Sequence, residues 1–141
     1  MSAHEVQNPV APVRPGAMML ELVMLPVTDI EEAKAFYRDR VGFTVDVDVT
    51  PVEGVRIVQL TPPGSYCSVT MASGLADGGA APGSVRGLHL VVADIDAARA
   101  ALVARGVEVD PVVDRGGGVL YAGFSDPDGN TWTLQHMPWR G

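Results

Sequence analysis

The segment VTDIEEAKAFYRDRVGF, at residues 27–43, decides the fold, because a similar segment, VADIDAARAALVARGV, occurs again at residues 92–107. In both, an Asp-Ile pair leads into an alanine-containing run that ends at a glycine. Asp29 and Asp94 hold matching places 65 residues apart, and the glycine of a later turn is repeated at the same offset. A constant offset indicates that the chain contains two copies of one supersecondary unit.

Each copy predicts a helix that begins at its aspartate. Asp29 and Asp94 can act as N-caps, because their carboxylates can accept hydrogen bonds from the free amides of a first helical turn. Alanine, leucine and aromatic residues then recur at helical spacing. Gly42 and Gly106 follow at the point where a helix end favours a residue that tolerates positive φ. We therefore expect a helix between each aspartate and its glycine.

Strands are expected before and after each helix. Residues 20–27 and 88–92 are apolar runs of strand length. In FTVDVDVT, which starts at Phe43, valines alternate with polar residues, as is typical of a half-buried strand. Further strands are expected at residues 55–60, 66–71, 119–124 and 131–136. The order of elements is therefore βαβββ, twice.

This order predicts an α+β fold with two tandem βαβββ modules in one domain. The expected boundaries are a flexible tail at 1–17, a first module at 18–73, a linker at 74–84 and a second module at 85–137. The linker sequence, GLADGGAAPGS, is rich in the small residues glycine and alanine.

Composition excludes several classes of function. The chain has 141 residues, 47% of them hydrophobic, which is enough for a core, and its net charge of −7 argues against nucleic acid and anionic membranes. No apolar block has the length of a signal peptide or a membrane span. Cys67 is the single cysteine, so an intramolecular disulfide and a thiolate-rich zinc site are excluded. We expect a soluble, cytoplasmic protein.

The turn sequences resemble one another as well. SDPDGN, at residues 125–130, spaces its carboxylates as a calcium-binding loop does, but the twelfth position would be Met137, where such a loop needs a bidentate glutamate. Proline and glycine in this segment, and in TPPGS at 61–65, predict tight turns instead.

The repeated segments, together with FSDPDGNTWTLQ at 124–135, resemble the signatures of the vicinal oxygen chelate superfamily. That superfamily includes glyoxalase I, extradiol dioxygenases, methylmalonyl-CoA epimerase, and bleomycin- and fosfomycin-resistance proteins. The resemblance covers about residues 18–137. It implies a glyoxalase-like incomplete barrel around a cavity, and a homodimer. It leaves the activity open, because one fold hosts many chemistries.

The metal-dependent members of that superfamily hold a divalent ion with four side chains, which the resemblance places at Leu22, Ser68, Gly87 and Thr133. Leucine and glycine have no ligating side chain, and neutral hydroxyls are poor substitutes for histidine and glutamate. We therefore expect neither a metal nor another cofactor at this place. An atypical divalent metal held by His89 and Gln135 stays open as an alternative.

Strand parity predicts which side chains face the cavity. The predicted ligand-binding residues are Met24, Gln59, Tyr66, Ser68, His89, Tyr121, Thr133 and Gln135. They combine apolar, aromatic and hydrogen-bonding groups, which is the usual lining of a small-molecule pocket. Core packing explains the tyrosines and the methionine equally well. A structural histidine, bonded to a neighbouring hydroxyl, explains His89 equally well.

Two functions are compatible with these residues, and the sequence favours the first. The first is a bleomycin resistance-like protein that binds a small organic ligand in a mainly apolar cavity without a metal. The second is a lyase- or isomerase-type enzyme of secondary metabolism or catabolism, metal-independent or with an atypical metal. In that enzyme His89 would be the catalytic acid or base, and Tyr121 or Gln135 would orient a carbonyl.

Overall fold

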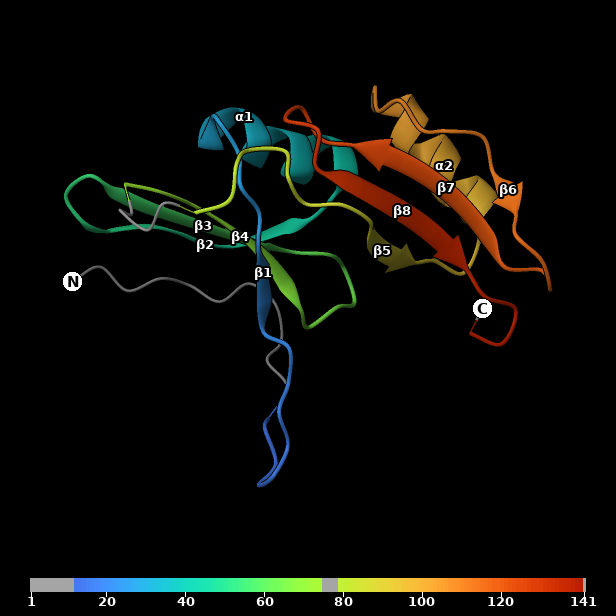
Figure 1. Ribbon diagram of the computed structural model, residues 1–141, viewed down its shortest axis with the longest axis horizontal. Helices are drawn as coiled ribbons and strands as arrows, with labels where there is room; N and C mark the ends of the chain where they lie inside the picture. Colours follow the sequence, from blue (N-terminus) through green and yellow to red (C-terminus); the bar gives the residue numbers. More distant parts are fainter. Residues whose placement is uncertain (1–11, 75–78, 141) are drawn as a thin grey trace. The chain divides into compact units, whose positions relative to one another are not determined.

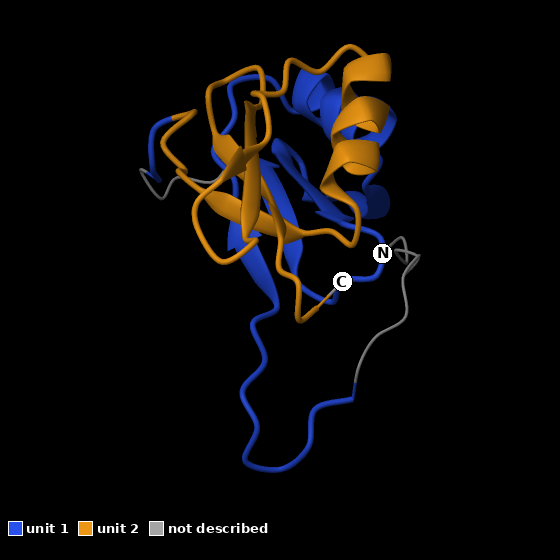
Figure 2. Ribbon diagram, turned by 90° about the vertical axis from the view of Figure 1, so that its right-hand side faces the viewer, with its two compact units in different colours: residues 1–81 blue, residues 82–141 orange. Residues whose placement is uncertain are grey.

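The structure is a computed structural model that describes residues 12–74 and 79–140 (Figure 1). The chain divides into two compact units, Met1–Ala81 and Pro82–Gly141 (Figure 2). Most of the predicted tail, and residues 75–78 of the predicted linker, lie outside the described residues.

The first unit holds a four-stranded mixed sheet with the strand order β1-β4-β3-β2. Strands β1 and β4 pair in parallel, and the other neighbours are antiparallel. Its elements are β1 (Leu22–Met24), α1 (Ile30–Ala35), the π-helix η1 (Phe36–Val41), β2 (Thr44–Val52), β3 (Val55–Thr61) and β4 (Ser68–Ser73).

The second unit repeats this topology with the strand order β5-β8-β7-β6. Its elements are β5 (Leu88–Val91), α2 (Ile95–Ala104), β6 (Val113–Asp114), β7 (Leu120–Ser125) and β8 (Thr131–His136). Again the first and last strands, β5 and β8, are parallel neighbours. The predicted α+β fold with two βαβββ modules is confirmed.

The helix boundaries follow the predicted caps. The side chain of Asp29 accepts a hydrogen bond from the amide of Glu32 at 3.1 Å, and Asp94 accepts from Ala97 at 3.0 Å. Gly42 and Gly106 have φ of 96° and 89°, values that favour glycine after a helix. No helix in the described part of the chain is both long and apolar enough to cross a membrane.

The first helix differs from the regular helix that its spacing predicts, because its second half, η1, winds as a π-helix. It ends where the amides of Gly42 and Phe43 both donate to the carbonyl of Tyr37. The ring of Tyr37 is fully buried, stacked on Phe43 with 5.6 Å between centroids and in edge contact with Phe36. The wider winding thus accompanies a cluster of three aromatic rings that helical spacing alone does not reveal.

Each sheet buries one face under its own helix. Helix α1 packs on β4, and α2 packs on β7 and β8 (Figure 1). On the helix side, the first sheet buries Val58, Leu60, Val69 and Met71, and the second buries Ala122, Phe124, Trp132 and Leu134. Because side chains alternate along a strand, their neighbours point to the opposite face, which we call the distal face of each sheet.

Strand β2 contains a β-bulge that breaks the predicted alternation. Val45 pairs with Leu60 and Val47 pairs with Gln59, so Asp46 is an extra residue in the ladder. An extra residue turns the side chains on its two sides toward opposite faces. As a result Val47 shares the distal face with Gln59, Asp46 is buried, and the valines of β2 do not form one stripe.

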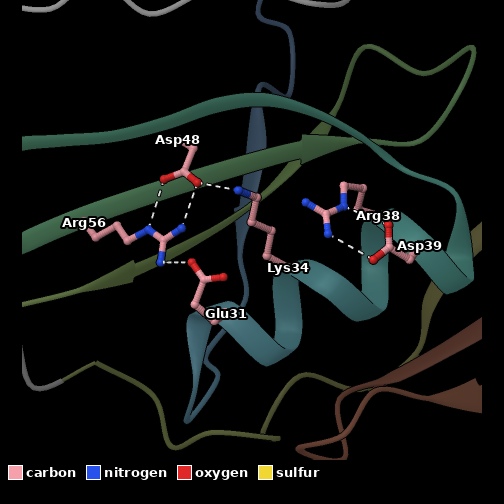
Figure 3. Close-up of polar contacts among 6 residues, drawn as sticks. All are labelled: Glu31, Lys34, Arg38, Asp39, Asp48 and Arg56. Carbon is pink, nitrogen blue, oxygen red and sulfur yellow. Dashed lines mark hydrogen bonds and ion pairs between the residues drawn. The ribbon is translucent and has the colours of Figure 1, made fainter.

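Downstream of the bulge, Asp48 lies on the α1 side of the sheet and belongs to a charged network (Figure 3). Both oxygens of Asp48 accept from Arg56, at 3.0 and 2.7 Å, and one also accepts from Lys34 at 2.6 Å. Arg56 also pairs with Glu31 at 2.5 Å. Since Glu31 and Lys34 belong to α1, the network ties that helix to β2 and β3.

The turn before β8 is built as its sequence predicts. Asp126 accepts hydrogen bonds from the amides of Asp128 and Asn130, both at 2.9 Å, and Gly129 has φ of 97°. The side chain of Asn130, fully buried, donates to Asp126 at 2.8 Å and accepts from the amide of Val85 at 3.0 Å. The acidic residues of this segment therefore organise backbone, and Asn130 joins the turn to the chain entering β5.

Candidate ligand-binding site

The distal face of the second sheet brings four of the predicted residues together. His89 on β5 lies opposite Thr133 on β8, and Tyr121 on β7 lies opposite Gln135 on β8. The helix side of β8 is occupied by the buried Trp132, so the assignment of faces predicted from strand parity holds here. Three adjacent strands thus present an imidazole, a phenol, a hydroxyl and an amide on one surface.

A hydrogen bond fixes the imidazole of His89. Its Nδ1 lies 2.6 Å from Oε1 of Gln135. An amide oxygen can only accept, so Nδ1 is the donor of this bond, and in the neutral imidazole Nε2 then carries the lone pair. The ring of Tyr121 stands edge-on to the imidazole, with 6.0 Å between centroids and 80° between planes. The exposed His89 therefore offers a hydrogen-bond acceptor, or a base, next to an aromatic surface.

An acidic side chain that sequence reasoning missed lies over the same face. Gly123 on β7 is opposite Thr133, and a Cβ at Gly123 would come within 3.1 Å of a carboxylate oxygen of Asp110. The amide of Asp110 donates to the carbonyl of Gly123 at 2.8 Å, and Arg99 of α2 donates to the carbonyl of Asp110 at 2.8 Å. The absent side chain of Gly123 leaves room for this carboxylate, and no sequence pattern pairs the two residues.

In the first module, the structure places three predicted residues as expected and separates a fourth. Gln59 and Ser68 lie on the distal face of the first sheet, and Met24, at the end of β1 opposite Thr70, is 49% exposed. Strand β4 begins at Ser68, so Tyr66 belongs to the β3–β4 connection and is 56% exposed. Strand parity therefore does not apply to Tyr66, because the predicted strand began two residues too early.

The same face carries a buried polar chain that sequence reasoning missed. Thr61 donates its hydroxyl proton to the carboxylate of Asp46, and the Thr61 and Ser68 hydroxyl oxygens are 2.6 Å apart. Asp46 reaches this position because of the bulge in β2. The alternating pattern of FTVDVDVT predicts a half-buried strand and does not single out Asp46, whose burial follows from the register of the strands.

Comparison with known proteins agrees with this architecture. The sequence profile of the Glyoxalase/Bleomycin resistance protein/Dioxygenase superfamily matches residues 20–134. The chain belongs to this superfamily. A comparison of this chain with curated proteins found no match.

Several solved structures from the superfamily are similar to the chain. The crystal structure of TnmS3, an antibiotic binding protein from Streptomyces sp. CB03234, is 36% identical, with a TM-score of 0.74 over 87% of this chain and 98% of that one. A glyoxalase/bleomycin resistance protein from the same Streptomyces strain is 41% identical, with a TM-score of 0.69 over 80% and 96% of the two chains. A superfamily member from Sphaerobacter thermophilus DSM 20745 is 32% identical, with a TM-score of 0.75 over 86% and 98%.

The positions that the resemblance assigns to the superfamily's metal ligands hold residues whose side chains do not fit a divalent ion. Leu22 lies opposite Ser68, and Gly87 offers only its backbone, whose amide donates to Thr131 at 2.7 Å. Across residues 12–74 and 79–140, no three His, Cys, Asp or Glu side chains lie close enough together to hold a metal. The donor chemistry at these positions is therefore that of hydroxyls and hydrocarbon, which bind divalent cations weakly.

Cys67, which directly precedes Ser68, has the properties of a structural thiol and not of a reactive one. Burial raises the pKa of its thiol, and the nearby Glu21 acts in the same direction. A raised pKa leaves less of the nucleophilic thiolate at neutral pH.

Proposed function

We propose that this protein binds an organic small molecule of the antibiotic kind, through the distal face of its second sheet and without a metal. The observation that carries the proposal is the surface formed by His89, Tyr121, Thr133 and Gln135. It sets a few oriented polar groups beside an aromatic ring, which is the make-up of small-molecule sites. On the first unit, Met24, Gln59, Ser68 and the exposed ring of Tyr66 are proposed as ligand contacts in their own right.

The similarity to TnmS3 supports this proposal. That protein is described as an antibiotic binding protein, and the 36% identity extends over 98% of its length. The metal-free part of the proposal rests on donor chemistry, since Leu22 and Gly87 stand where a metal-dependent relative needs ligating side chains.

Equilibrium dialysis of the protein against bleomycin, doxorubicin and tetracycline tests the binding function. We expect at least one of these antibiotics to bind, and Gln135→Leu to weaken that binding because it releases the imidazole of His89. Val103→Ala, on the exposed side of α2, is the matched control and should bind as the parent does. Retained fold with no binding of any of the three would contradict the proposal.

An enzymatic function is favoured by one specific observation. The bond from His89 to Gln135 holds the imidazole through Nδ1 and leaves Nε2 outside that bond, and a neutral imidazole fixed in this way next to a ligand surface can act as a general base. Mass spectrometry of the bound antibiotic after prolonged incubation distinguishes the two functions. A new product that disappears in His89→Ala, with binding retained, would establish catalysis; an unchanged ligand supports binding alone.

We further propose that the protein works in the cytoplasm, and that it is a homodimer, as the resemblance to the superfamily implies. Met18 and Leu20, just before β1, are exposed apolar side chains that a second copy could cover. Light scattering coupled to size exclusion should give twice the chain mass, and a monomer at micromolar concentration would contradict the dimer. Cell fractionation tests the compartment.

A further inference from the structure

The buried chain of polar groups on the distal face of the first sheet has a defined direction. Asp46, Thr61 and Ser68 are 8%, 3% and 4% exposed, so water satisfies little of their hydrogen-bonding capacity. Thr61 has a single hydroxyl proton, and that proton is given to the carboxylate of Asp46. The contact of 2.6 Å between Thr61 and Ser68 must then use the proton of Ser68. The proton of Ser68 is thereby committed, and its oxygen keeps a lone pair able to accept.

A second hydroxyl on this face has no partner. Thr70 lies two residues beyond Ser68 on β4 and is 5% exposed, and its Oγ1 makes no hydrogen bond. Residues two apart on a strand share a face at a spacing of roughly 7 Å. Buried hydroxyls are almost always hydrogen-bonded, because an unpaired one gives up its bonds to water without replacement. An unpaired buried hydroxyl next to an oriented polar chain is therefore a candidate contact for a bound ligand.

We propose that Ser68 and Thr70 form a subsite for a neutral hydrogen-bond donor, such as a hydroxyl or amine, carried by an aromatic ligand. This inference rests on the proposed small-molecule binding function and names the chemistry that the first module would recognise. Ser68 would accept the donor's hydrogen, while Thr70 would find the partner that it lacks. Gln59, the register partner of Thr70 on β3, offers amide groups beside them.

The negative charge of Asp46 on this face sets which ligand groups the subsite prefers. The carboxylate of Asp46 lies at the end of the chain that leads to Ser68, so an anion brought to the subsite would meet a negative charge in a region of low dielectric. A group that only accepts, such as an ether, would leave the lone pair of Ser68 unmatched. Donors should bind best, ethers less well and carboxylates least. The flexible Met24, opposite Thr70, can shift to admit the ligand.

Three naphthalene probes of similar shape test this order. We would titrate the full chain with 2-naphthol, 2-methoxynaphthalene and 2-naphthoate and follow the backbone amides by NMR. We expect 2-naphthol to shift the amides of residues 68–70 and to bind about 2- to 10-fold more tightly than the methyl ether, the range that one hydrogen bond supplies. Absence of shifts at these amides, or equal binding of all three probes, would overturn the subsite.

Matched substitutions separate the hydroxyls from the scaffold. Ser68→Ala and Thr70→Val keep shape while removing the hydroxyls, and each should reduce the preference for 2-naphthol over its ether. Ser73→Ala and Thr50→Val make the same changes at exposed positions and should leave the preference unchanged. A preference that survives in both Ser68→Ala and Thr70→Val would overturn the subsite.

The charge of Asp46 is tested by Asp46→Asn, whose amide oxygen can still accept from Thr61. This variant should raise the affinity for 2-naphthoate relative to 2-naphthol, and an unchanged ratio would overturn the electrostatic part of the proposal. Failure here is distinguishable from failure of the proposed function. If an antibiotic still binds and that binding still depends on Gln135, the function stands and only the subsite is lost.

Discussion

One hydrogen bond, from Nδ1 of His89 to Gln135, decides which nitrogen of the imidazole a ligand would meet. The two residues are 46 positions apart in the chain, and the parallel pairing of β5 with β8 brings them together. Tyr121 joins them because β7 pairs with the other side of β8. The candidate site of this module is therefore a product of strand register rather than of local sequence.

The ring of Tyr121 should contribute to ligand binding mainly through its aromatic surface. Tyr121→Leu should weaken the affinity for an aromatic antibiotic about 2- to 10-fold, in line with roughly 0.5–1.5 kcal/mol for one aromatic contact. Tyr121→Phe keeps the ring and should retain most of the affinity. Isothermal titration calorimetry of both variants checks this, and equal losses in the two would assign the effect to the hydroxyl instead.

Sequence alone could predict the residues of regular strands and not those of irregular backbone. Thr133 and Gln135 alternate with the buried Trp132, so strand parity was sufficient to place them. Asp46 sits in a bulge and Asp110 in a connection, where the alternation of side chains carries no information. These two carboxylates are the charged groups that a motif search overlooks.

At the scale of elements, the charged network of α1 with β2 and β3 makes stability depend on pH (Figure 3). Hydrogen bonds from Arg56, with a further contribution from Lys34, lower the pKa of Asp48 from its usual 3.8 to about 2. A carboxyl group with a lowered pKa in the folded state binds its proton more readily when unfolded. Its stabilisation is therefore complete above pH 4 to 5 and is lost as the pH falls towards 2.

Asp48→Asn should lower the free energy of unfolding by about 1 kcal/mol at pH 7, a value reduced for partial exposure of the network to solvent. The difference from the parent protein should shrink as the pH is taken from 5 to 2. Urea unfolding at several pH values measures it. Asp39→Asn, in the more exposed pair with Arg38, is the control and should change stability less. A difference that does not vary with pH would contradict this account.

A substitution that disrupts the turn before β8 should lower the free energy of unfolding more than the loss of a surface ion pair does. Asn130→Ala removes the partner of the Val85 amide and one partner of the buried Asp126, and leaving such groups unsatisfied should cost about 2–3 kcal/mol. Urea unfolding against Ser125→Ala, an exposed position of the same turn, measures the loss. A loss below about 0.5 kcal/mol would mean that water replaces the side chain of Asn130.

The elements themselves were largely predictable, because their ends are marked by chemistry. Each helix begins after an N-cap aspartate, Asp29 or Asp94, and is followed by a glycine that marks its end. Both N-caps form as expected. The π-winding of η1 was not predictable, since it accompanies the packing of Tyr37 between Phe36 and Phe43. The spacing of residues along a single helix does not reveal such a cluster of rings or the wider winding that goes with it.

At the scale of the whole molecule, the internal repeat was the most informative signal. It predicted two βαβββ modules and membership of a superfamily that the profile match over residues 20–134 establishes. The same family hosts metal enzymes and binding proteins, so the fold does not select the chemistry. That selection depends on individual positions, and here Leu22 and Gly87 replace ligands while His89 and Gln135 bond to each other.

The most direct test of metal-free ligand binding is to compare antibiotic binding before and after exhaustive treatment with EDTA, with elemental analysis of both samples. We expect substoichiometric nickel, zinc, iron and manganese, and the same dissociation constant for doxorubicin, bleomycin or tetracycline in both samples. One divalent ion per chain, whose removal abolishes binding and whose return restores it, would contradict the account.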